Sequence, residues 1–373
     1  MKKVAASSIP TTTFEHAASD SDAGNSTVSP TGHIVRDSAW DFCEARRGER
    51  TRQRTSLWNN AKHTVAQAMK LPSKPGAMEG YLTQQADKVL TSIIYQDLAK
   101  CGEQPPCKFA LVASGSYASQ QMSSHSDIDF YVIVDNSTRP LQDHSWFHFA
   151  AIRWRDKMRK HDFGGALVLC PMYAPSGNAE CIATAKAAAD NSLYTLFNSR
   201  LIEFEYNDPK VYADFEKQRQ KNLCDPKARQ FLLDLYTKRG MMRRHKWRDL
   251  PSMEVVDVKA LRREFDFLIA HMALKNNVVA SGTYNRIAAL RDRGLLSAER
   301  ASALSTSVDE IGRLRISAQL QYNKEFDLID TVGNRRNLFN MPIATLVKLP
   351  KIRDQIMELY DDAWTAGSSV DAR

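Results

Sequence analysis

The stretch Leu111-Val-Ala-Ser-Gly-Ser-Tyr-Ala-Ser-Gln-Gln-Met-Ser-Ser-His-Ser-Asp-Ile-Asp129 holds the pattern that decides the fold. Short apolar runs lie at its two ends, 109–113 and 130–134, and Gly, Ser and Asp bound them as they bound buried strands. Asp127 and Asp129 stand one residue apart, so on a strand their side chains project to the same face. We therefore predict two strands joined by a Gly-Ser turn, a short helical segment and an acidic edge.

These residue types suit the binding of a nucleoside triphosphate together with a divalent metal. Transfer of a nucleotidyl group is an in-line displacement at the α-phosphorus, where negative charge must be neutralised and the triphosphate held in place. Asp127 and Asp129 are candidate ligands for Mg²⁺ or Mn²⁺. Gly115 lacks a Cβ, so backbone N–H groups there can approach phosphate oxygens, and the Ser116 hydroxyl adds a donor.

A purely structural interpretation makes Ser126 a turn residue and the two aspartates a solvated strand edge. An isolated Asp-x-Asp or Gly-Ser is common on protein surfaces. The ordered combination of strand, Gly-Ser, short helix, Ser-Asp-Ile-Asp and strand is far more specific. The structural interpretation also leaves unexplained why two acidic residues directly precede a buried strand.

The quoted stretch resembles the core of the DNA-polymerase-β-like nucleotidyltransferase superfamily. More narrowly, it is similar to the bacterial enzymes that uridylylate the PII protein or adenylylate glutamine synthetase, and to their relatives. Weaker similarity continues through 189–202, 256–262 and 294–320, so the resemblance covers roughly residues 80 to 325. It implies an α+β fold with a small polymerase-β-type α/β core, N-terminal helices and a C-terminal helical domain.

The resemblance also implies roles for individual residues. It assigns metal binding to Asp127 and Asp129, and contacts with the triphosphate to Gly115 and Ser116. It gives Ser126 the role of supporting the metal-binding turn. NTP would be the co-substrate and Mg²⁺ or Mn²⁺ the cofactor.

Lys259 falls where those enzymes carry a Lys-containing segment that leads into a long helix, and it is a candidate ligand of the nucleotide. The chain departs from the family at Ser119 and Gln121, where Arg and Glu are often found. These departures leave the acceptor and the nucleotide geometry open. Further candidate cations for the triphosphate or an acidic partner are Arg239, Arg243, Arg244 and Lys246.

The motif supplies two carboxylates, and it lacks the third one that such sites commonly use. Glu203 and Glu205 alternate with apolar and aromatic residues and would share one face of a strand, which makes both candidate catalytic residues. The downstream resemblance instead places this stretch at a helix end. Asn198 stands where relatives often carry an acid, so a degenerate or regulatory site stays open.

Two histidines need an interpretation as well. His125, beside the acidic pair, is a candidate proton acceptor, and a structural turn residue is the alternative. His271 lies on an apolar helical pattern, and we interpret it as a core or interface residue.

Composition divides the chain into three parts. Residues 1–36 are rich in Ser, Thr, Ala, Asp and Gly and predict a disordered tail, because they bury too little apolar surface. We assign 37–222 to the nucleotidyltransferase core with its leading helices and 223–373 to a domain that looks almost wholly helical. A third strand is predicted over 166–170, and helices over 40–69, 78–100, 180–202, 209–221, 227–244, 258–276, 283–294, 297–322 and 351–364.

Charge and composition limit the function classes. The formal charge of +8 favours an anionic ligand or partner, and no nucleic-acid-binding signature accompanies the basic clusters at 46–54 and 238–248. We expect no membrane span, because the longest apolar runs are far too short. Six scattered cysteines predict reduced thiols in a cytoplasmic protein. The alternative left open for 1–36 is a leader read by a dedicated bacterial secretion system, as in an effector.

Three function hypotheses follow from the sequence. The first is a metal-dependent enzyme that attaches AMP or UMP to a hydroxyl of a protein. The second is nucleotidylation of a small molecule. The third is a non-catalytic nucleotide sensor that keeps the fold; nucleotide binding without pyrophosphate release would distinguish it.

Overall fold

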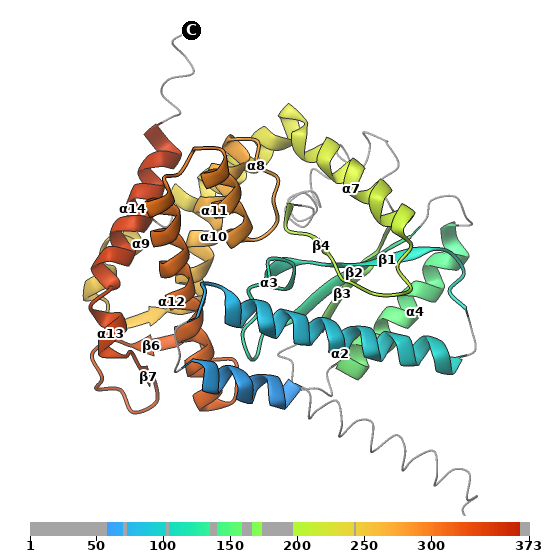
Figure 1. Cartoon of the computed structure of the whole chain (residues 1–373), viewed down its shortest axis with the longest axis horizontal. Helices are drawn as coiled ribbons and strands as arrows, with labels where there is room; N and C mark the ends of the chain where they lie inside the picture. The colour runs from blue at the N-terminus through green and yellow to red at the C-terminus, as the bar shows by residue number, and fades with distance from the viewer. Residues whose placement is uncertain are drawn as a thin grey trace, which may run out of the picture. The chain divides into compact units, whose positions relative to one another are not determined.

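A computed structural model describes residues 58–69, 73–101, 104–134, 140–158, 166–173, 197–241 and 244–365 (Figure 1). All of them belong to one compact unit, Arg50–Arg373. The tail predicted for 1–36 lies outside these residues. No helix in the described parts of the chain has both the length and the apolar composition needed to span a membrane.

The larger sheet contains the strands on either side of the motif. Its order is β3-β2-β1-β4, with β1 (Phe109–Ala113) antiparallel to both β2 (Ile128–Val134) and β4 (Arg200–Leu201). The strand β3 (Ala166–Tyr173) runs parallel to β2 and extends three residues beyond the predicted 166–170. The two strands predicted around the motif are confirmed, because their apolar residues are buried along their whole length.

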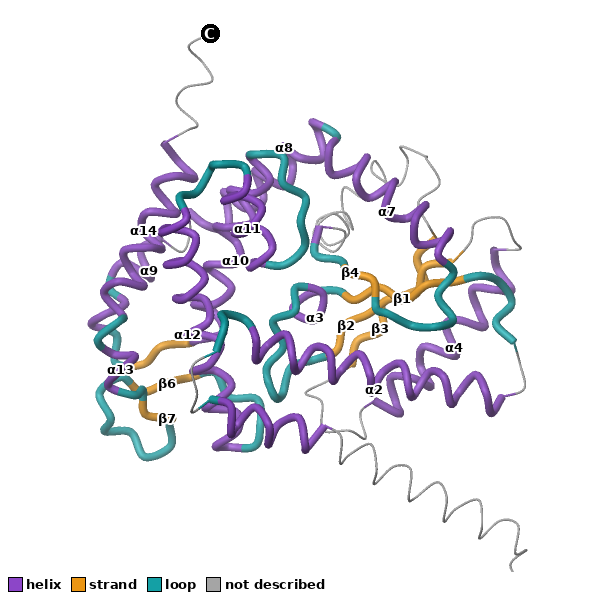
Figure 2. The backbone as a smooth tube through the Cα atoms, in the orientation of Figure 1, coloured by secondary structure: helices purple, strands orange, loops and turns teal. Residues whose placement is uncertain are grey.

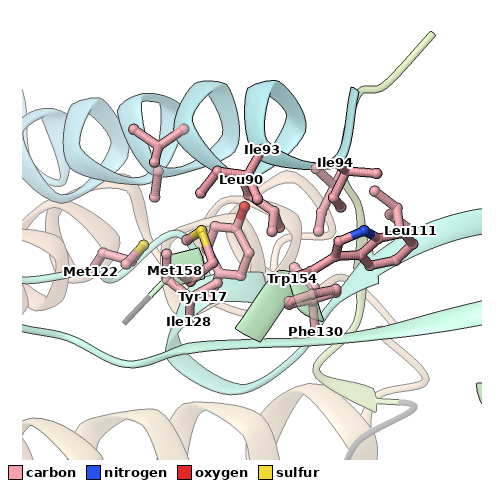
Figure 3. Close-up of a cluster of buried hydrophobic side chains, with 14 of the residues drawn as sticks. Leu90, Ile93, Ile94, Leu111, Tyr117, Met122, Ile128, Phe130, Trp154 and Met158 are labelled. Atoms are coloured by element: carbon pink, nitrogen blue, oxygen red, sulfur yellow. The ribbon is translucent and has the colours of Figure 1, made fainter. Parts of the chain in front are cut away.

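Alternation along β1 and β2 gives the sheet two apolar faces. On one face, Leu111 and Phe130 pack beneath α2 (Ala77–Cys101) and α4 (Pro140–Met158), as Figure 3 shows with Leu90, Ile93, Ile94 and Trp154. On the other face, Val112, Tyr131 and Ile133 pack against α7 (Pro209–Cys224) and α8 (Pro226–Met241). The helix α4 was not among the predicted elements.

The C-terminal half has a core of its own. Its helices are α9 (Arg244–Arg248), α10 (Val258–Lys275), α11 (Thr283–Asp292), α12 (Ala298–Tyr322), α13 (Ile343–Leu346) and α14 (Leu349–Thr365), with a 3₁₀ turn, η2, at Leu250–Ser252. Side chains cap several of these helices. Asp257 accepts a hydrogen bond from Ala260 N, and Ser297 accepts one from Arg300 N, as expected of N-cap residues.

The C-terminal part is mostly helical, as predicted, but it also contains a small sheet that the sequence did not predict. A second sheet forms there from β5 (Val255–Asp257), β6 (Leu328–Asp330) and β7 (Phe339–Asn340), with β6 antiparallel to β5 and parallel to β7. The two sheets stand apart, the larger beside α2, α4 and α7 and the smaller beside α12 and α13 (Figure 2). The fold is therefore α+β, as predicted.

One further element differs from expectation. A helix was predicted over 180–202. Its residues up to 196 lie outside the described residues, and residues 200–201 form the short strand β4 instead. Leu223, Ala228, Leu232 and Tyr236 belong to the apolar cluster on the sheet. Residues just past 223 thus cover the α/β core.

Candidate active site

The acidic edge of β2 lies against the Gly-Ser turn. Ser114 N donates to Asp129 O over 2.8 Å, which ties the end of β1 to the start of β2. Gly115 follows with φ +57°, and a Cβ built there would lie 3.1 Å from Asp129 Oδ2. The absence of a side chain at Gly115 therefore leaves space for this carboxylate.

The pKa of Asp129 is raised to about 6, mainly by burial and also by the charge of Asp127, while the charge of Lys259 lowers it. The charges of Asp127 and Lys259 thus act on the Asp129 carboxylate. Strand alternation puts Asp129 on the same side of the sheet as Tyr131 and Ile133. That side also packs against α10.

The segment between Gly115 and Asp127 is held by its own polar groups. The short helix α3 (Gly115–Ala118) is anchored by buried Tyr117, whose hydroxyl donates to Asp87. Buried Ser126 accepts from Ser123 N over 2.8 Å and so closes the turn before Asp127. The side chain of Ser116 makes no hydrogen bond with any residue that the structure describes.

A cavity of about 290 Å³ joins this edge to the C-terminal helices. The α/β core contributes the predicted residues Gly115, Ser116, Ser126, Asp127 and Asp129, together with Ser119, Gln121, Ser123 and Asn198. The lining from elsewhere consists of Glu79, Lys259, Arg262, Arg263, Asp266, Thr283, Arg286, Gly312, Arg315 and Glu325. The sequence motif and Lys259 thus meet in one cavity.

Polar residues at helical spacing on α10 face the cavity. Lys259 pairs with Glu325 and lies 3.8 Å from Asp327. Arg262 pairs with Glu79 at 3.0 Å. Exposed Arg263 has no ion-pair partner among the residues that the structure describes. It is therefore available to an anionic ligand.

Glu79 brings an acid from α2 to the wall of the cavity. Its carboxylate is buried, with Arg262 Nη2 at 3.0 Å and the Tyr284 hydroxyl at 3.1 Å. Burial raises the pKa of Glu79 to about 7 although Arg262 lowers it, so desolvation outweighs the ion pair. Gly312 on α12 approaches so closely that a Cβ there would lie 2.7 Å from Glu79 Oε1.

Two further contacts close the cavity between the core and the helices. Asp266 Oδ1 accepts hydrogen bonds from Thr283 Oγ1 at 2.6 Å and from Gln121 Nε2 at 3.2 Å. Buried Arg286 donates to Asn198 Oδ1 at 2.9 Å. Asn198, the position considered for a third acid, thus lies at the cavity as an amide held by a guanidinium.

Several predicted candidates lie elsewhere. Glu203 and Glu205 follow β4 in a loop rather than on the expected strand, and they line a separate hollow with Lys88 and Tyr95 of α2. The chain turns away after only two residues of β4, so the alternation seen in the sequence does not continue as a strand.

His125 is buried outside the lining of the cavity. Its backbone N–H donates to Gln319 Oε1 at 3.0 Å, and its ring lies 3.4 Å from Lys62 Nζ. These contacts favour the structural alternative for His125.

Sequence reasoning missed the contributions of Glu79, Arg262, Arg263 and Asp266. A signal for the α10 residues was present, because Lys259, Arg262, Arg263 and Asp266 follow the i, i+3, i+4, i+7 spacing of one helix face. Glu79 gave no such signal, since its place beside Arg262 depends on packing between distant segments.

Residues 239–330 match a protein-family model described as "Putative nucleotidyltransferase substrate binding domain". The matched segment runs from the end of α8 to β6 and carries the α10, α11 and α12 walls of the cavity. Comparison with curated proteins gave no match. The family match supports a nucleotidyltransferase-related family and nucleotidyl transfer as the general chemistry.

Proposed function

We propose that the chain is a metal-dependent nucleotidyltransferase that moves a nucleoside monophosphate from an NTP to a hydroxyl of a protein, releasing pyrophosphate. One observation carries this proposal: Asp127 and Asp129 share a cavity with Gly115, Ser116 and the basic face of α10. Acidic groups for a metal and basic groups for phosphates thus line the same cavity, as the metal complex of a triphosphate requires.

The donor set fits Mg²⁺ or Mn²⁺. Within the described parts of the chain, no three His, Cys, Asp or Glu side chains form a metal site. Mg²⁺ is commonly held by one or two carboxylates, with phosphate oxygens and water completing the octahedron, and Asp127 and Asp129 match that arrangement. When bound, the metal would neutralise charge on the phosphate groups.

The remaining residues would bind and orient the triphosphate. Ser116 offers a hydroxyl donor beside Gly115, whose missing Cβ leaves the backbone accessible. Lys259 and Arg263 are one helical turn apart on α10 and add positive charge to the same cavity. Attack by the oxygen of an acceptor hydroxyl at the α-phosphorus would form the new P–O bond as the bond to pyrophosphate breaks, and the hydroxyl proton would pass to solvent.

The size of the cavity supports a protein acceptor over a small molecule. At about 290 Å³ it lies just below the usual range of small-molecule pockets, so a bound nucleotide would leave no room inside it for a second small molecule. An acceptor group on a protein could reach the cavity from outside. AMP and UMP both remain candidates for the transferred group.

One observation favours a second candidate function, a non-catalytic nucleotide-binding module. Asn198 brings an amide to the cavity, and its Oδ1 accepts from Arg286. Asp127 and Asp129 would then bind the metal–nucleotide complex without a third carboxylate. Such a module would bind NTP and release no pyrophosphate.

The test is transfer of label from each α-³²P-NTP, with Mg²⁺ or Mn²⁺, to proteins of a cell lysate. We expect a labelled band that an Asp127→Asn/Asp129→Asn variant loses by about 100-fold or more, because charge stabilisation at the phosphates is removed. Glu203→Gln/Glu205→Gln is the matched control and should keep the label, since these acids line another hollow. Nucleotide binding without label transfer or pyrophosphate release would support the binding module instead.

A further inference from the structure

Asp266 is an acid of the cavity that the proposed chemistry does not use. It belongs to α10 and lines the cavity together with Asp127 and Asp129. Its side chain is 27% exposed, so a ligand in the cavity can reach this carboxylate. Within the described ranges, no three acidic, His or Cys side chains lie close enough to hold a metal ion. Asp266 therefore does not complete a metal site with the two aspartates of the motif.

One oxygen of Asp266 is held in place and the other is open. Oδ1 accepts hydrogen bonds from Thr283 Oγ1 at 2.6 Å and from Gln121 Nε2 at 3.2 Å. Oδ2 makes no hydrogen bond with any residue that the structure describes, and it keeps accessible surface. Because Oδ1 is tied both to α11 and to the α/β core, the free oxygen has a fixed position in the cavity. It is thus preorganised for a ligand.

The surroundings of Asp266 show which kind of group Oδ2 can bind. Both hydrogen bonds to Oδ1 come from neutral donors. Arg262, one turn before Asp266 on α10, donates through Nη2 to Glu79, and its Nε lies 3.7 Å from Asp266 Oδ1, beyond hydrogen-bond distance. An ionised carboxylate only accepts hydrogen bonds, so the free oxygen calls for a donor on the ligand.

The place of Asp266 along α10 indicates which part of a nucleotide it meets. Lys259 is at the N-terminal end of α10, and its charge acts on Asp129. Asp266 is seven residues further along, which is about 10 Å of helix. With the phosphates beside Asp129 and Lys259, Asp266 would meet the sugar or the base, and the ribose carries hydroxyl donors in every NTP. Carboxylates accept from the ribose 2′-hydroxyl in other nucleotide-binding folds.

We propose that Asp266 Oδ2 accepts a hydrogen bond from the ribose 2′-hydroxyl, so that the site selects ribonucleotides over 2′-deoxyribonucleotides. Asp266 would then determine the sugar specificity of the site, with Thr283 and Gln121 as positioning residues that hold its other oxygen. This inference rests on the proposed nucleotide site. It applies equally to a transferase and to a binding module, because both must hold the sugar.

The test is isothermal titration of the full chain with Mg²⁺ and eight probes: ATP, GTP, CTP, UTP and the 2′-deoxy counterpart of each. We expect the ribonucleotide that binds most tightly to bind about tenfold more tightly than its 2′-deoxy counterpart, because a hydrogen bond to a charged acceptor is lost. Equal affinities would overturn this inference and leave the nucleotide site standing. If none of the four ribonucleotides binds, the nucleotide site itself is wrong and the inference falls with it.

Variants assign the preference to Asp266. Asp266→Ala removes the acceptor and should bind the ribonucleotide and its 2′-deoxy counterpart equally. Asp266→Asn keeps an oxygen for the donors of Thr283 and Gln121 and should retain at most about a threefold preference, because hydrogen bonds to neutral groups are weaker. Asp292→Ala, at an exposed acid of α11 outside the cavity lining, is the control and should keep the tenfold preference.

The ratio of the two affinities separates sugar recognition from a structural role. If Asp266 only joined α10 to α11 and the core, its loss would weaken both nucleotides by the same factor and leave their ratio unchanged. A tenfold preference that persists in Asp266→Asn would overturn the proposal even if Asp266→Ala fails to fold.

Discussion

Gly115 illustrates how one residue can determine the geometry of a site. Its φ of +57° lies in the left-handed region, and its Cα faces the Asp129 carboxylate. Gly294, at the end of α11, has a similar φ of +71° but open space around it. Both glycines adopt a positive φ that other residues rarely adopt. Only Gly115 also needs the absence of a Cβ, because the Asp129 carboxylate lies beside it.

Gly115→Ala is therefore expected to impair both stability and binding. A non-glycine residue in the left-handed region costs about 1 kcal/mol or more, so Gly115→Ala and Gly294→Ala should both lower the free energy of unfolding. Only Gly115→Ala should also displace Asp129 and weaken Mg²⁺–ATP binding, by about tenfold. Urea unfolding and calorimetric titration measure the two effects. Equal ATP affinity in the two variants would contradict this assignment of Gly115.

At the residue scale, the sequence could predict which residues meet where they are close along the chain. Gly115, Ser116, Asp127 and Asp129 lie within 15 residues, and the structure brings them to one cavity. Glu203 and Glu205 lie outside this cavity, because alternation alone does not show where a strand ends. Their position depends on how the chain turns after β4, which is a property of tertiary packing.

At the scale of secondary-structure elements, Gly312 determines how closely α12 packs against α2. A Cβ at Gly312 would meet Glu79 Oε1 at 2.7 Å, whereas a Cβ at Gly80, also helical, meets nothing within 4 Å. Gly80→Ala should stabilise the protein by about 0.5–1 kcal/mol, because alanine loses less backbone entropy in a helix. Gly312→Ala should instead destabilise it by about 1–3 kcal/mol through overpacking. Guanidinium unfolding of both variants tests this difference, and stabilisation by Gly312→Ala would refute the close packing.

The buried Glu79 predicts a dependence of stability on pH. Its pKa rises from 4.5 to about 7 on folding, so the folded state favours the protonated form. This contribution to stability is fully present below pH 4.5 and is lost as pH rises through 7. Glu79→Gln removes the titration, so the stability of the wild type relative to Glu79→Gln should fall between pH 5 and 8. Urea unfolding across that pH range measures the difference in the free energy of unfolding between the two proteins. If this difference stays constant with pH, Glu79 keeps an ordinary pKa.

Helices and strands were predictable from the sequence where their periodic pattern of apolar residues is long. The helices α2, α10, α11, α12 and α14 begin and end within two residues of expectation. The missed helix α4 does carry helical spacing at 147, 150, 154 and 158. The strands β5, β6 and β7 have only two or three residues each, too few for a period of two to show. The pairing of β5 with β6 also joins segments more than 70 residues apart.

The whole molecule is held together across the cavity. Ala270 and Leu274 of α10 belong to the apolar cluster on the sheet, and Ile316 of α12 belongs to the cluster beneath α2. Arg262 adds a buried ion pair to Glu79. The C-terminal half thus contributes side chains to the core that supports Asp127 and Asp129.

We therefore expect residues 50–373 to unfold as one cooperative unit, with Mg²⁺–NTP stabilising both halves together. At a hundred times its Kd, a ligand that binds only the folded state adds about 2.7 kcal/mol. Hydrogen exchange followed by mass spectrometry over a urea series can compare peptides from β1 with peptides from α14. Both should lose protection at the same urea concentration, and Mg²⁺–ATP should raise that concentration equally for both.

The variant Asp127→Asn/Asp129→Asn separates cooperativity from ligand binding. Its peptides from β1 and α14 should still lose protection together, because neither aspartate belongs to the apolar clusters that join the halves. The shift caused by Mg²⁺–ATP should disappear, because the proposed metal ligands are gone. A shift confined to the peptides from β1 in the wild type would instead mean that the nucleotide contacts the α/β core alone and that α10 does not contribute to its binding.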